Sequence, residues 1–376
     1  MLSKVLYIRN FANKVNPKSY NLQEIGFGKA LIKKGFDCDV IYFDNNNKLK
    51  IEEVFQFRNN KLRILWMNGM KFLNNGIFTK VLRKKFLDEY DLIITTEYNQ
   101  IMTFFLSNLC PEKLVLYHGP YGDNSNKKIQ LLYDSFFLPR MRKNIKLNFS
   151  KSDLANNYLM KKGFKDVITL GVGLDTEHID ERINLNKEIE SKLEKVKDKK
   201  VLLYIGVLEE RRNISFLLNI LKNILTLNNE IRLIIVGTGR EDDTKKYWNF
   251  IKSNNLEESI IYFDKIEQRD LWRIYESSDV MLFPTNYDIF GMVLLESMHF
   301  QVPIISSVNG GSSTLIQHNI NGLIIDKFDV SLWISEIQRL LNDSGLIAQI
   351  KQAAAETVRE ATWDHIAERM LMQIKH

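Results

Sequence analysis

The chain has 376 residues, 45% of them hydrophobic and 26% charged, an ordinary composition for a folded globular protein. No apolar run reaches the ~20 residues that span a bilayer, and the apolar start of the chain is too short for a secretory signal. Its two cysteines, Cys38 and Cys110, stand in no metal-binding or redox spacing. We therefore expect a cytoplasmic protein with structural thiols, long enough for two domains.

The net charge of +6 is unevenly distributed along the chain. Residues 1–170 carry 28 Lys and Arg against 15 Asp and Glu, a balance of +13, and the remaining residues carry 24 against 31, a balance of −7. A basic half predicts an anionic partner: a phosphorylated substrate, an anionic membrane surface or nucleic acid. A lysine-rich solvated surface would have the same charge, so these alternatives stay open.

The first half alternates strand and helix patterns. Strands are predicted at residues 4–9, 37–43, 91–97 and 113–119, and a helical pattern at 21–35 ends on Gly35. This alternation predicts βαβ units around a parallel sheet. Asp37 and Asp39 have the Asp-x-Asp spacing of some metal sites, but their place between a turn and a strand favours a structural role. No other cluster of carboxylates and histidines predicts a metal.

The glycine-containing segment 167–180 predicts a connection between domains, and the alternation restarts after a charged helix at 187–200. Strands are predicted at 201–208, 230–239, 259–266, 279–284, 303–307 and 321–326, and helices at 214–225, 270–278 and 362–376. We predict an α/β fold of two doubly wound Rossmann-like domains facing a central cleft. Residues 1–170, completed by the closing helix 361–376, would form the N-terminal domain, and residues 171–360 the C-terminal domain.

The segment around Gly291 carries the strongest chemical signal. Gly291 opens an apolar helix whose first N–H groups have no intrahelical partners, so the helix start favours an anion such as phosphate. Asp288 in the preceding loop and Glu296 inside the helix could accept hydrogen bonds from a sugar and a ribose. A nucleotide diphosphate-sugar would use all three features. The alternative is that Asp288 caps the helix and Glu296 pairs with a lysine.

This segment resembles the donor loop of the retaining GT-B glycosyltransferases of family four (glycosyl transferases group 1). Their pattern is an acid, seven residues and a Glu, with Phe-Gly inside it and Gly-Gly downstream. The corresponding residues here are Asp288, Phe290, Gly291, Met292, Val293 and Glu296, followed by Gly310 and Gly311. The first acid of the family is usually Glu, so Asp288 is one methylene shorter and the identity of the sugar stays open.

Residues 204–218 resemble the strand-loop-helix of the family whose basic residues bind the donor diphosphate. The resemblance places Gly206 in the turn and Arg212 at the position of the family's lysine. The family's first basic position is occupied by Val207, and Arg211 is a candidate substitute because a guanidinium pairs well with phosphate oxygens. The alternative for Arg211 and Arg212 is a solvated surface pair.

The order of the remaining motifs adds further candidates. Residues 234–239 and 262–266 resemble the strands beside the nucleotide pocket, which implies that backbone near Ile266 contacts the base. His118 follows a strand where the family has a histidine facing the reacting sugar; the alternative is a packed or solvated histidine. The family's Gly-Gly loop after the first strand is absent, and Ser19 and Tyr20 are the candidate acceptor contacts in its place.

The resemblance implies a metal-independent, cofactor-free transferase of the hexosyltransferase type. It would move a sugar with retention from a nucleotide-diphosphate donor, UDP being the commonest, with His118, Asp288 and Arg212 as catalytic residues. Basic stretches at 57–66, 80–86 and 138–146 favour a peripheral position at the inner face of the plasma membrane and a lipid-linked or surface-polysaccharide acceptor. Ordinary amphipathic helices packed inward are the alternative for these stretches.

Three other functions are compatible with parts of the sequence. A non-catalytic GT-B subunit that stabilises a partner transferase would account for Val207 and for the absent Gly-Gly loop. Another GT-B enzyme, an epimerase or a phosphorylase, resembles the sequence less. A nucleic-acid-binding protein would need a recognition helix or an aromatic platform, and neither motif is found, so we predict no nucleic-acid partner.

Overall fold

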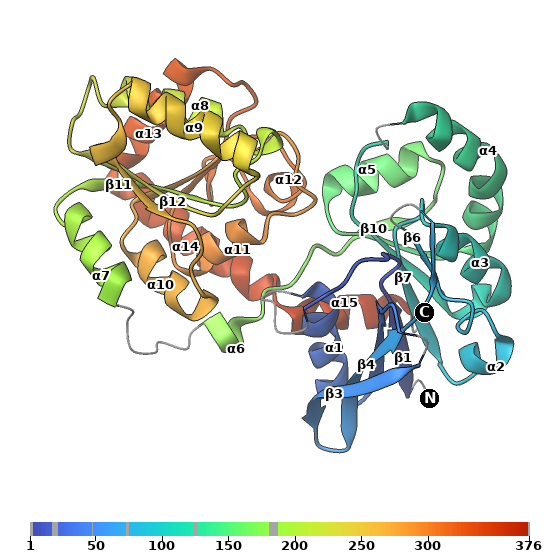
Figure 1. The fold of residues 1–376 in the computed structure, drawn as a ribbon. Helices are drawn as coiled ribbons and strands as arrows, with labels where there is room; N and C mark the ends of the chain where they lie inside the picture. The colour runs from blue at the N-terminus through green and yellow to red at the C-terminus, as the bar shows by residue number, and fades with distance from the viewer. Residues whose placement is uncertain are drawn as a thin grey trace. The chain divides into compact units, whose positions relative to one another are not determined.

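The computed structural model describes residues 3–16, 22–46, 48–72, 75–123, 126–179 and 187–374. The chain divides into two units: unit 1 comprises Met1–Leu174 and Ala361–His376, and unit 2 comprises Asp175–Glu360. The predicted boundary after residue 170 lies close to this division, and the closing segment 361–376 is part of unit 1. Each unit is a mainly parallel sheet covered by helices (Figure 1).

Unit 1 contains an eight-stranded sheet with the order β10-β9-β8-β7-β1-β2-β4-β3. Its strands are β1 (Lys4–Ile8), β2 (Asp37–Phe43), β3 (Lys50–Phe57), β4 (Asn60–Met67), β7 (Leu92–Thr96), β8 (Leu114–His118), β9 (Leu147–Ser150) and β10 (Val167–Thr169). Only the edge strand β3 is antiparallel to its neighbour. A separate hairpin joins β5 (Met70–Phe72) and β6 (Asn75–Ile77).

The helices of unit 1 cover both faces of this sheet. They are α1 (Gln23–Lys33), α2 (Lys84–Leu87), α3 (Ile101–Leu109), α4 (Lys127–Asn144), α5 (Asp153–Lys161) and α15 (Trp363–Ile374), with a short 3-10 turn at Pro111–Lys113. Alternate residues of each central strand point to opposite faces. Leu6, Ile8 and Leu116 therefore pack with Met102 of α3 and Met141 of α4 on one face.

On the other face of the same sheet, α1 and α15 lie side by side (Figure 1). Phe27 of α1 packs edge-on against Trp363 of α15, with 5.9 Å between the ring centroids, and against Tyr7 of β1 at 6.2 Å. A side chain at Gly26 would lie 2.2 Å from the Trp363 indole nitrogen, so glycine permits this contact. The C-terminal helix is therefore fixed on unit 1 by direct packing.

Unit 2 contains a six-stranded parallel sheet with the order β13-β12-β11-β14-β15-β16. Its strands are β11 (Lys200–Ile205), β12 (Ile231–Val236), β13 (Ile260–Phe263), β14 (Val280–Phe283), β15 (Ile304–Ser306) and β16 (Leu323–Ile324). Its helices are α6 (Thr176–Ile179), α7 (Lys187–Leu193), α8 (Ile214–Ile224), α9 (Glu241–Ser253), α10 (Gln268–Glu276), α11 (Met292–His299), α12 (Ser312–Leu315), α13 (Val330–Asn342) and α14 (Ser344–Glu360). Short 3-10 turns occupy Glu194–Val196, Glu210–Arg212 and Glu257–Ser259.

Helices α8, α9 and α13 lie together on one side of the unit 2 strands, with α10 and α11 on the other side (Figure 1). Leu217, Ile251 and Trp333, one residue from each of the first three helices, are buried in the same hydrophobic core. Within the described ranges, no helix is both long and apolar enough to cross a membrane.

One sequence-based alternative and one expectation about elements are wrong. The helical alternative fails at residues 57–66, which comprise the last residue of β3, a tight turn and most of β4, where Leu62, Ile64 and Leu65 are buried in an extended strand. The helix expected at 187–200 ends at Leu193, and β11 begins at Lys200.

Candidate functional site

Two loops at the carboxyl ends of central strands of the unit 2 sheet carry Gly206, Arg211, Arg212, Asp288 and Gly291 of the predicted donor residues. The chain runs from β11 outward through β12 to β13 and then returns to β14 on the other side of β11. The order of the strands therefore reverses between β11 and β14, and ligands of such sheets bind at the carboxyl ends of the strands at this switch point. The loop 206–213 follows β11, and the loop 284–291 follows β14.

A hydrogen-bonded ion pair joins these two loops. Nη1 of Arg212 donates to the carboxylate of Asp288, and the side chains of the two residues are only 12% and 15% exposed. The guanidinium of Arg212 also lies 5.5 Å from the centre of the Phe283 ring. Arg212 is therefore not the solvated surface residue of the alternative interpretation, and the structure brings it together with Asp288 as one charged pair.

Arg211 is placed differently from its neighbour. Its side chain is 42% exposed and lies 2.5 Å from a Glu209 carboxylate oxygen, while Nη1 donates to the Tyr287 carbonyl oxygen at 2.8 Å. The backbone N–H of Asn286 donates to the Arg211 carbonyl oxygen at 2.9 Å, which adds a second link between the loops. Arg211 thus combines an anchored backbone with a guanidinium that solvent or a ligand can reach.

Gly291 is the N-cap of α11 and has a φ of +69°, in the left-handed region that favours glycine. The first hydrogen bond of the helix runs from the Leu294 N–H to the Gly291 carbonyl oxygen, so the N–H groups of Met292 and Val293 precede it. Asp288 does not cap this helix. Its Oδ1 instead accepts from the Phe290 N–H at 3.3 Å inside the preceding turn.

Gly310 and Gly311 allow a third loop to approach the Asp288 loop. The Gly310 N–H donates to the Asp288 carbonyl oxygen at 3.0 Å. A Cβ atom at Gly310 would lie 2.1 Å from the Ile289 carbonyl oxygen, and one at Gly311 would lie 1.6 Å from that of Phe290. The downstream glycine pair therefore fixes the shape of the acidic loop through close backbone packing.

Glu296 is buried on α11, with 2% of its surface exposed, and Oε2 accepts from the Tyr275 hydroxyl at 2.9 Å. The Tyr275 ring in turn stacks on Phe300, with 5.0 Å between the centroids. The predicted alternative named a lysine as the partner of Glu296, whereas the hydrogen bond seen here comes from a tyrosine. Sequence patterns could not indicate Tyr275, because it lies on α10 and meets Glu296 only after the helices pack.

Gly206 lies at the end of β11, where its N–H donates to the Val236 carbonyl oxygen at 2.9 Å. A Cβ atom at Gly237 would come within 1.9 Å of the Gly206 carbonyl oxygen, so these two strand ends meet through their backbones. Val207, where the family has a basic residue, is 48% exposed.

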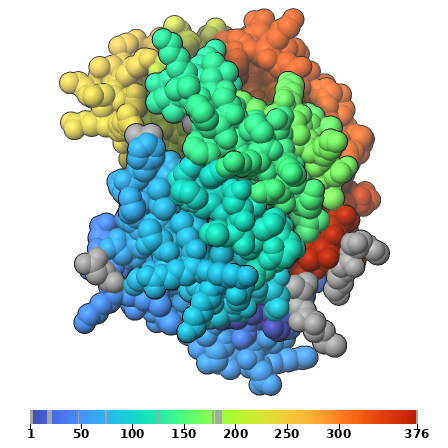
Figure 2. All heavy atoms as spheres, turned by 90° about the vertical axis from the view of Figure 1, so that its right-hand side faces the viewer, coloured from blue at the N-terminus to red at the C-terminus, as the bar shows by residue number. Residues whose placement is uncertain are grey.

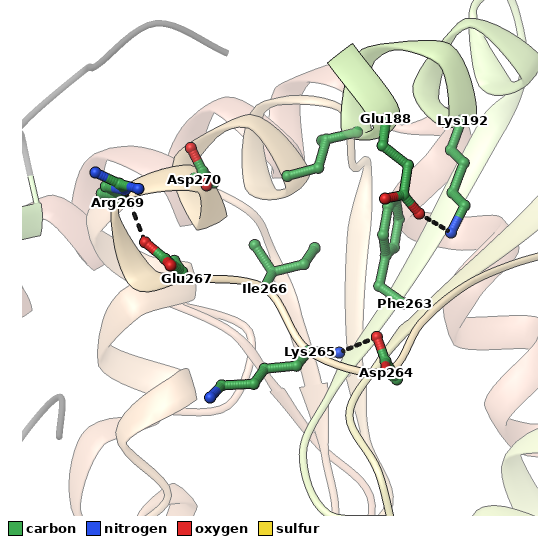
Figure 3. A pocket seen from close by; sticks show the side chains of 10 residues that line it. Glu188, Lys192, Phe263, Asp264, Lys265, Ile266, Glu267, Arg269 and Asp270 are labelled. Carbon is green, nitrogen blue, oxygen red and sulfur yellow. Dashed lines mark hydrogen bonds and ion pairs between the residues drawn. The ribbon is translucent and has the colours of Figure 1, made fainter. Parts of the chain in front are cut away.

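Ile266 lines a pocket beside the end of β13 (Figure 3). The pocket encloses roughly 360 Å³ between the loop after β13 and helices α7 and α10. Its lining residues are Glu188, Ile189, Lys192, Phe263, Asp264, Lys265, Ile266, Glu267, Arg269 and Asp270. The sequence indicated Ile266, whereas the contribution of α7 depends on tertiary packing.

In unit 1, His118 ends β8 and is fully buried. Its Nδ1 lies 2.8 Å from Oε2 of Glu97, which also accepts from the Gly119 N–H at 3.0 Å, and Lys151 Nζ lies 3.8 Å from Oε1. Within the described ranges, Nε2 of His118 has no hydrogen-bond partner. The Tyr158 ring stacks on the imidazole at 6.0 Å between centroids. Glu97 was not among the predicted site residues.

The neighbours of Glu97 determine the pKa of its carboxyl group. Burial by itself raises the pKa of this carboxyl, but the hydrogen bond from His118 and the charges of Lys151 and His118 lower the pKa below its ordinary value. Glu97 also has a φ of +60°, an unusual conformation for a residue other than glycine. The carboxylate is therefore held charged at the carboxyl ends of neighbouring strands.

Ser19 and Tyr20 lie outside the described residues. Asp39 is a structural residue: it pairs with Arg63 at 2.7 Å and accepts from the Tyr90 hydroxyl at 2.8 Å. In the part of the chain that the structure describes, no group of three or more His, Cys, Asp and Glu residues could hold a metal ion.

A family model described as glycosyl transferases group 1 matches residues 186–357, which lie almost entirely in unit 2 and include the Arg212–Asp288 pair. The match covers most of unit 2 and includes the acid, Phe-Gly, Glu and Gly-Gly pattern of the loops described above.

The sequence relatives of this chain are distant. An uncharacterized glycosyltransferase of Methanocaldococcus jannaschii is 28% identical over 190 residues, which cover 50% of this chain and 47% of the relative. A D-inositol 3-phosphate glycosyltransferase of Xylanimonas cellulosilytica is 25% identical over 176 residues, 46% of this chain and 42% of the relative. The chain thus spans less than half the length of these relatives. An uncharacterized glycosyltransferase of Haemophilus influenzae is 24% identical over 336 residues, 87% of each chain.

Solved structures show the fold of the whole chain. A crystal structure of Anabaena HepE in complex with UDP superposes with a TM-score of 0.73 at 14% identity, covering 99% of each chain. The fold is therefore GT-B, with unit 2 as the second of two Rossmann-like domains.

Proposed function

We propose that this chain is a glycosyltransferase that moves a sugar from a nucleotide-diphosphate donor, a UDP-sugar, to an acceptor hydroxyl. The observation that carries this proposal is the Arg212–Asp288 pair at the switch point of a group 1 domain. HepE, which has the same fold, has been crystallised with UDP and with UDP-glucose. The acceptor class we propose is a lipid-linked or surface-polysaccharide glycan, reached from the cytoplasmic side of the membrane.

The donor diphosphate would lie against Arg211, Arg212 and the start of α11. Nε of Arg212 is buried and has no hydrogen-bond partner within the described ranges, so this guanidinium keeps a donor for an anion. The N–H groups of Met292 and Val293 at the helix start would donate to phosphate oxygens, and the helix dipole favours the negative charge there. A phosphate between these groups would compete with Asp288 for Arg212.

The nucleoside would extend from the diphosphate to the edge of the sheet. A pocket of roughly 360 Å³ beside Ile266 has a volume in the range of small-molecule sites, and a base would use backbone groups of this loop. Glu296 would accept from the ribose hydroxyls with one oxygen while Tyr275 holds the other.

The reaction would break the bond between the anomeric carbon and the leaving phosphate oxygen and form a new bond to the acceptor oxygen on the same face of the sugar. The departing phosphate oxygen would take the acceptor proton, so no side-chain base is required. The catalytic work of the protein is then electrostatic. Arg211 and Arg212 stabilise the leaving diphosphate without a metal, and Asp288 orients the sugar once Arg212 has turned to phosphate. The prediction that His118 contacts the sugar stays a prediction.

A thermal-shift panel of UDP, GDP and ADP with their common sugar conjugates, without added metal, tests donor binding. A ligand at 100 times its dissociation constant should stabilise the fold by about 2.7 kcal/mol. We expect one nucleotide class to stabilise the protein and the shift to be lost in Arg212→Ala and Glu296→Ala. Arg339→Ala is the matched control, because Arg339 forms a 2.7 Å pair with Glu336 elsewhere in unit 2. No shift with any nucleotide would contradict the proposal.

The alternative of a non-catalytic subunit is favoured by one observation, the exposed Val207 at a position where the family has a basic residue. Hydrolysis of the donor distinguishes the transferase from the non-catalytic subunit. A slow release of the sugar from the stabilising nucleotide-sugar, abolished in Arg212→Ala, would support the transferase. Donor binding with no hydrolysis and no transfer to added glycans would support the subunit.

A further inference from the structure

The outward face of α4 is unusual because it exposes large apolar side chains. Phe136 is 71% exposed, Leu131 66% and Leu132 61%, and Ile129 beside them is 51% exposed. Leu132 and Phe136 are four residues apart, so they lie on the same side of the helix, and Leu131 lies at the border of that side. Contiguous exposed apolar residues on a folded domain usually mark an interaction surface.

This face is not needed for the core of unit 1. Helix α4 already buries its opposite side through Gln130, Leu138 and Met141. The ring of Phe137 packs at 4.7 Å from that of Phe104 on α3, which fixes the inner side of the helix further. The exposed apolar residues of the outward face are therefore not needed to pack α4 against the rest of unit 1.

Basic side chains flank the apolar residues on the outward face. Exposed Lys128 comes one turn before Leu131, and exposed Arg140 and Lys143 follow Phe136 at intervals of four and three residues. Helix α4 carries five Lys and Arg and a single acid, Asp134. Asp134 is largely buried and pairs with Lys162 at 2.7 Å, so it does not offset the exposed positive charge.

We infer that the outward face of α4 docks on the surface of an anionic lipid bilayer. Leu131, Leu132 and Phe136 would enter the boundary between headgroups and acyl chains, and Lys128, Arg140 and Lys143 would lie at the lipid phosphates. A bilayer offers an apolar layer and an anionic layer side by side, which matches an exposed apolar stripe with basic ends. Helix α4 lies at the right of Figure 1 and thus on the face turned toward the viewer in Figure 2.

This surface differs from the three basic stretches that the sequence indicated. The apolar residues of these stretches are mostly core residues: Leu62, Ile64 and Leu65 in β4, Val81 before α2, and Leu138, Met141 and Ile145 at the end of α4. Buried side chains cannot enter a bilayer while unit 1 stays folded. The exposed apolar residues lie instead one to two turns earlier in α4, between the basic residues.

Co-sedimentation with vesicles tests the inference without any donor or acceptor. The full chain should bind vesicles of phosphatidylglycerol and phosphatidylcholine, bind pure phosphatidylcholine weakly, and lose binding as salt screens the charges. The triple variant Leu131→Ser, Leu132→Ser, Phe136→Ser should bind the anionic vesicles at least about tenfold more weakly. Leu227→Ser, which removes a leucine that is 63% exposed in unit 2, should bind like the unchanged chain.

A second variant, Lys128→Gln, Arg140→Gln, Lys143→Gln, separates charge from apolar contact. It should lose roughly fivefold in binding per basic residue on anionic vesicles and change little on phosphatidylcholine. The inference is overturned if the unchanged chain does not bind anionic vesicles, or if the serine variant binds them equally well. It is also overturned if the face instead joins two copies of the chain, seen as a dimer that the serine variant dissolves.

The inference deepens the proposed function, since a lipid-linked acceptor would be met at a membrane. The two proposals fail separately, because the vesicle assay contains no nucleotide and the thermal-shift panel contains no lipid. Unchanged nucleotide shifts and an unchanged melting temperature in the serine variant would show that only membrane binding is affected.

Discussion

Replacing Arg212 by Met should destabilise unit 2 and weaken donor binding at the same time. The side chains of Arg212 and Asp288 are 12% and 15% exposed, so removing the arginine leaves most of a carboxylate away from water. Breaking a fully buried pair costs about 3–5 kcal/mol. Because this pair keeps some solvent contact, we expect a loss of about 2–3 kcal/mol, or about 4–12 °C in melting temperature for a unit of this size.

A double-mutant cycle isolates the pair itself. Asp288→Asn removes the charge of the partner with little change in shape, and the double variant removes both charges. We expect a coupling free energy of about 1–2 kcal/mol between Arg212 and Asp288 from scanning calorimetry, so that the double variant is more stable than the sum of the single losses implies. Arg339→Met is the matched control: its exposed pair with Glu336 should contribute less than about 1 kcal/mol.

The same variants should separate binding from turnover. Arg212→Met removes charge-assisted hydrogen bonds to phosphate and should weaken UDP about 10- to 100-fold. Asp288→Asn should not weaken UDP binding and should strengthen it if anything, because the guanidinium is no longer shared with a carboxylate, but it should lower sugar transfer. Titration calorimetry with UDP measures the first quantity. Additive stability losses, or equal loss of UDP affinity in both variants, would refute the assignment of Arg212 to phosphate and Asp288 to sugar.

Two further predictions follow from the packing of the site. The pKa of Glu97 is lower in the folded chain than its ordinary value of 4.5, so the carboxylate stabilises the fold above that pH and loses this contribution as the pH falls through the folded value. The difference in free energy of unfolding between the unchanged chain and Glu97→Gln, measured with urea from pH 7 downward, should therefore shrink below about pH 4.5. A difference that does not depend on pH would contradict the charged pairing with His118. Gly311→Ala should lower the free energy of unfolding by about 1–3 kcal/mol, because its Cβ atom would lie 1.6 Å from the Phe290 carbonyl oxygen and the loop must shift. In the exposed control Gly345→Ala the nearest neighbouring atom would be 3.4 Å away, and the loss should be less than about 0.5 kcal/mol. Equal losses in the two variants would argue against the close packing of the loops.

Local patterns in the sequence were sufficient to predict most of the α/β architecture. Buried central strands are continuous apolar runs, such as residues 201–205 and 231–236, and such runs are recognisable without knowledge of the fold. The prediction fails at β3 and β4, because strands near an exposed sheet edge mix charged and apolar residues. The predicted helix at 187–200 is longer than α7, because the charged composition of α7 continues into the turn that follows it.

The sequence likewise indicated part of the candidate site but not the partners of its acidic residues. The spacing of Asp288, Gly291 and Glu296 predicted the switch-point loop, since a glycine that opens a helix and its neighbouring acids are local features. The partners of these acids are not local: Arg212 is 76 residues from Asp288, and Tyr275 is 21 residues from Glu296 on another helix. No pattern in the sequence specifies which of many arginines or tyrosines will meet a given carboxylate.

The amino-acid sequence by itself thus determined the strand and helix order, the glycines of the tight turns and the acid-glycine-acid loop, because each depends on neighbours within a few residues. The tertiary structure decided which charges pair, that Glu97 meets His118 across adjacent strands, and which side of α4 stays uncovered. Helix α4 is apolar on both sides, so its periodicity could not distinguish the packed face from the exposed one. Which face of α4 is packed depends on the positions of the sheet and of α3, and these positions are set only when unit 1 folds.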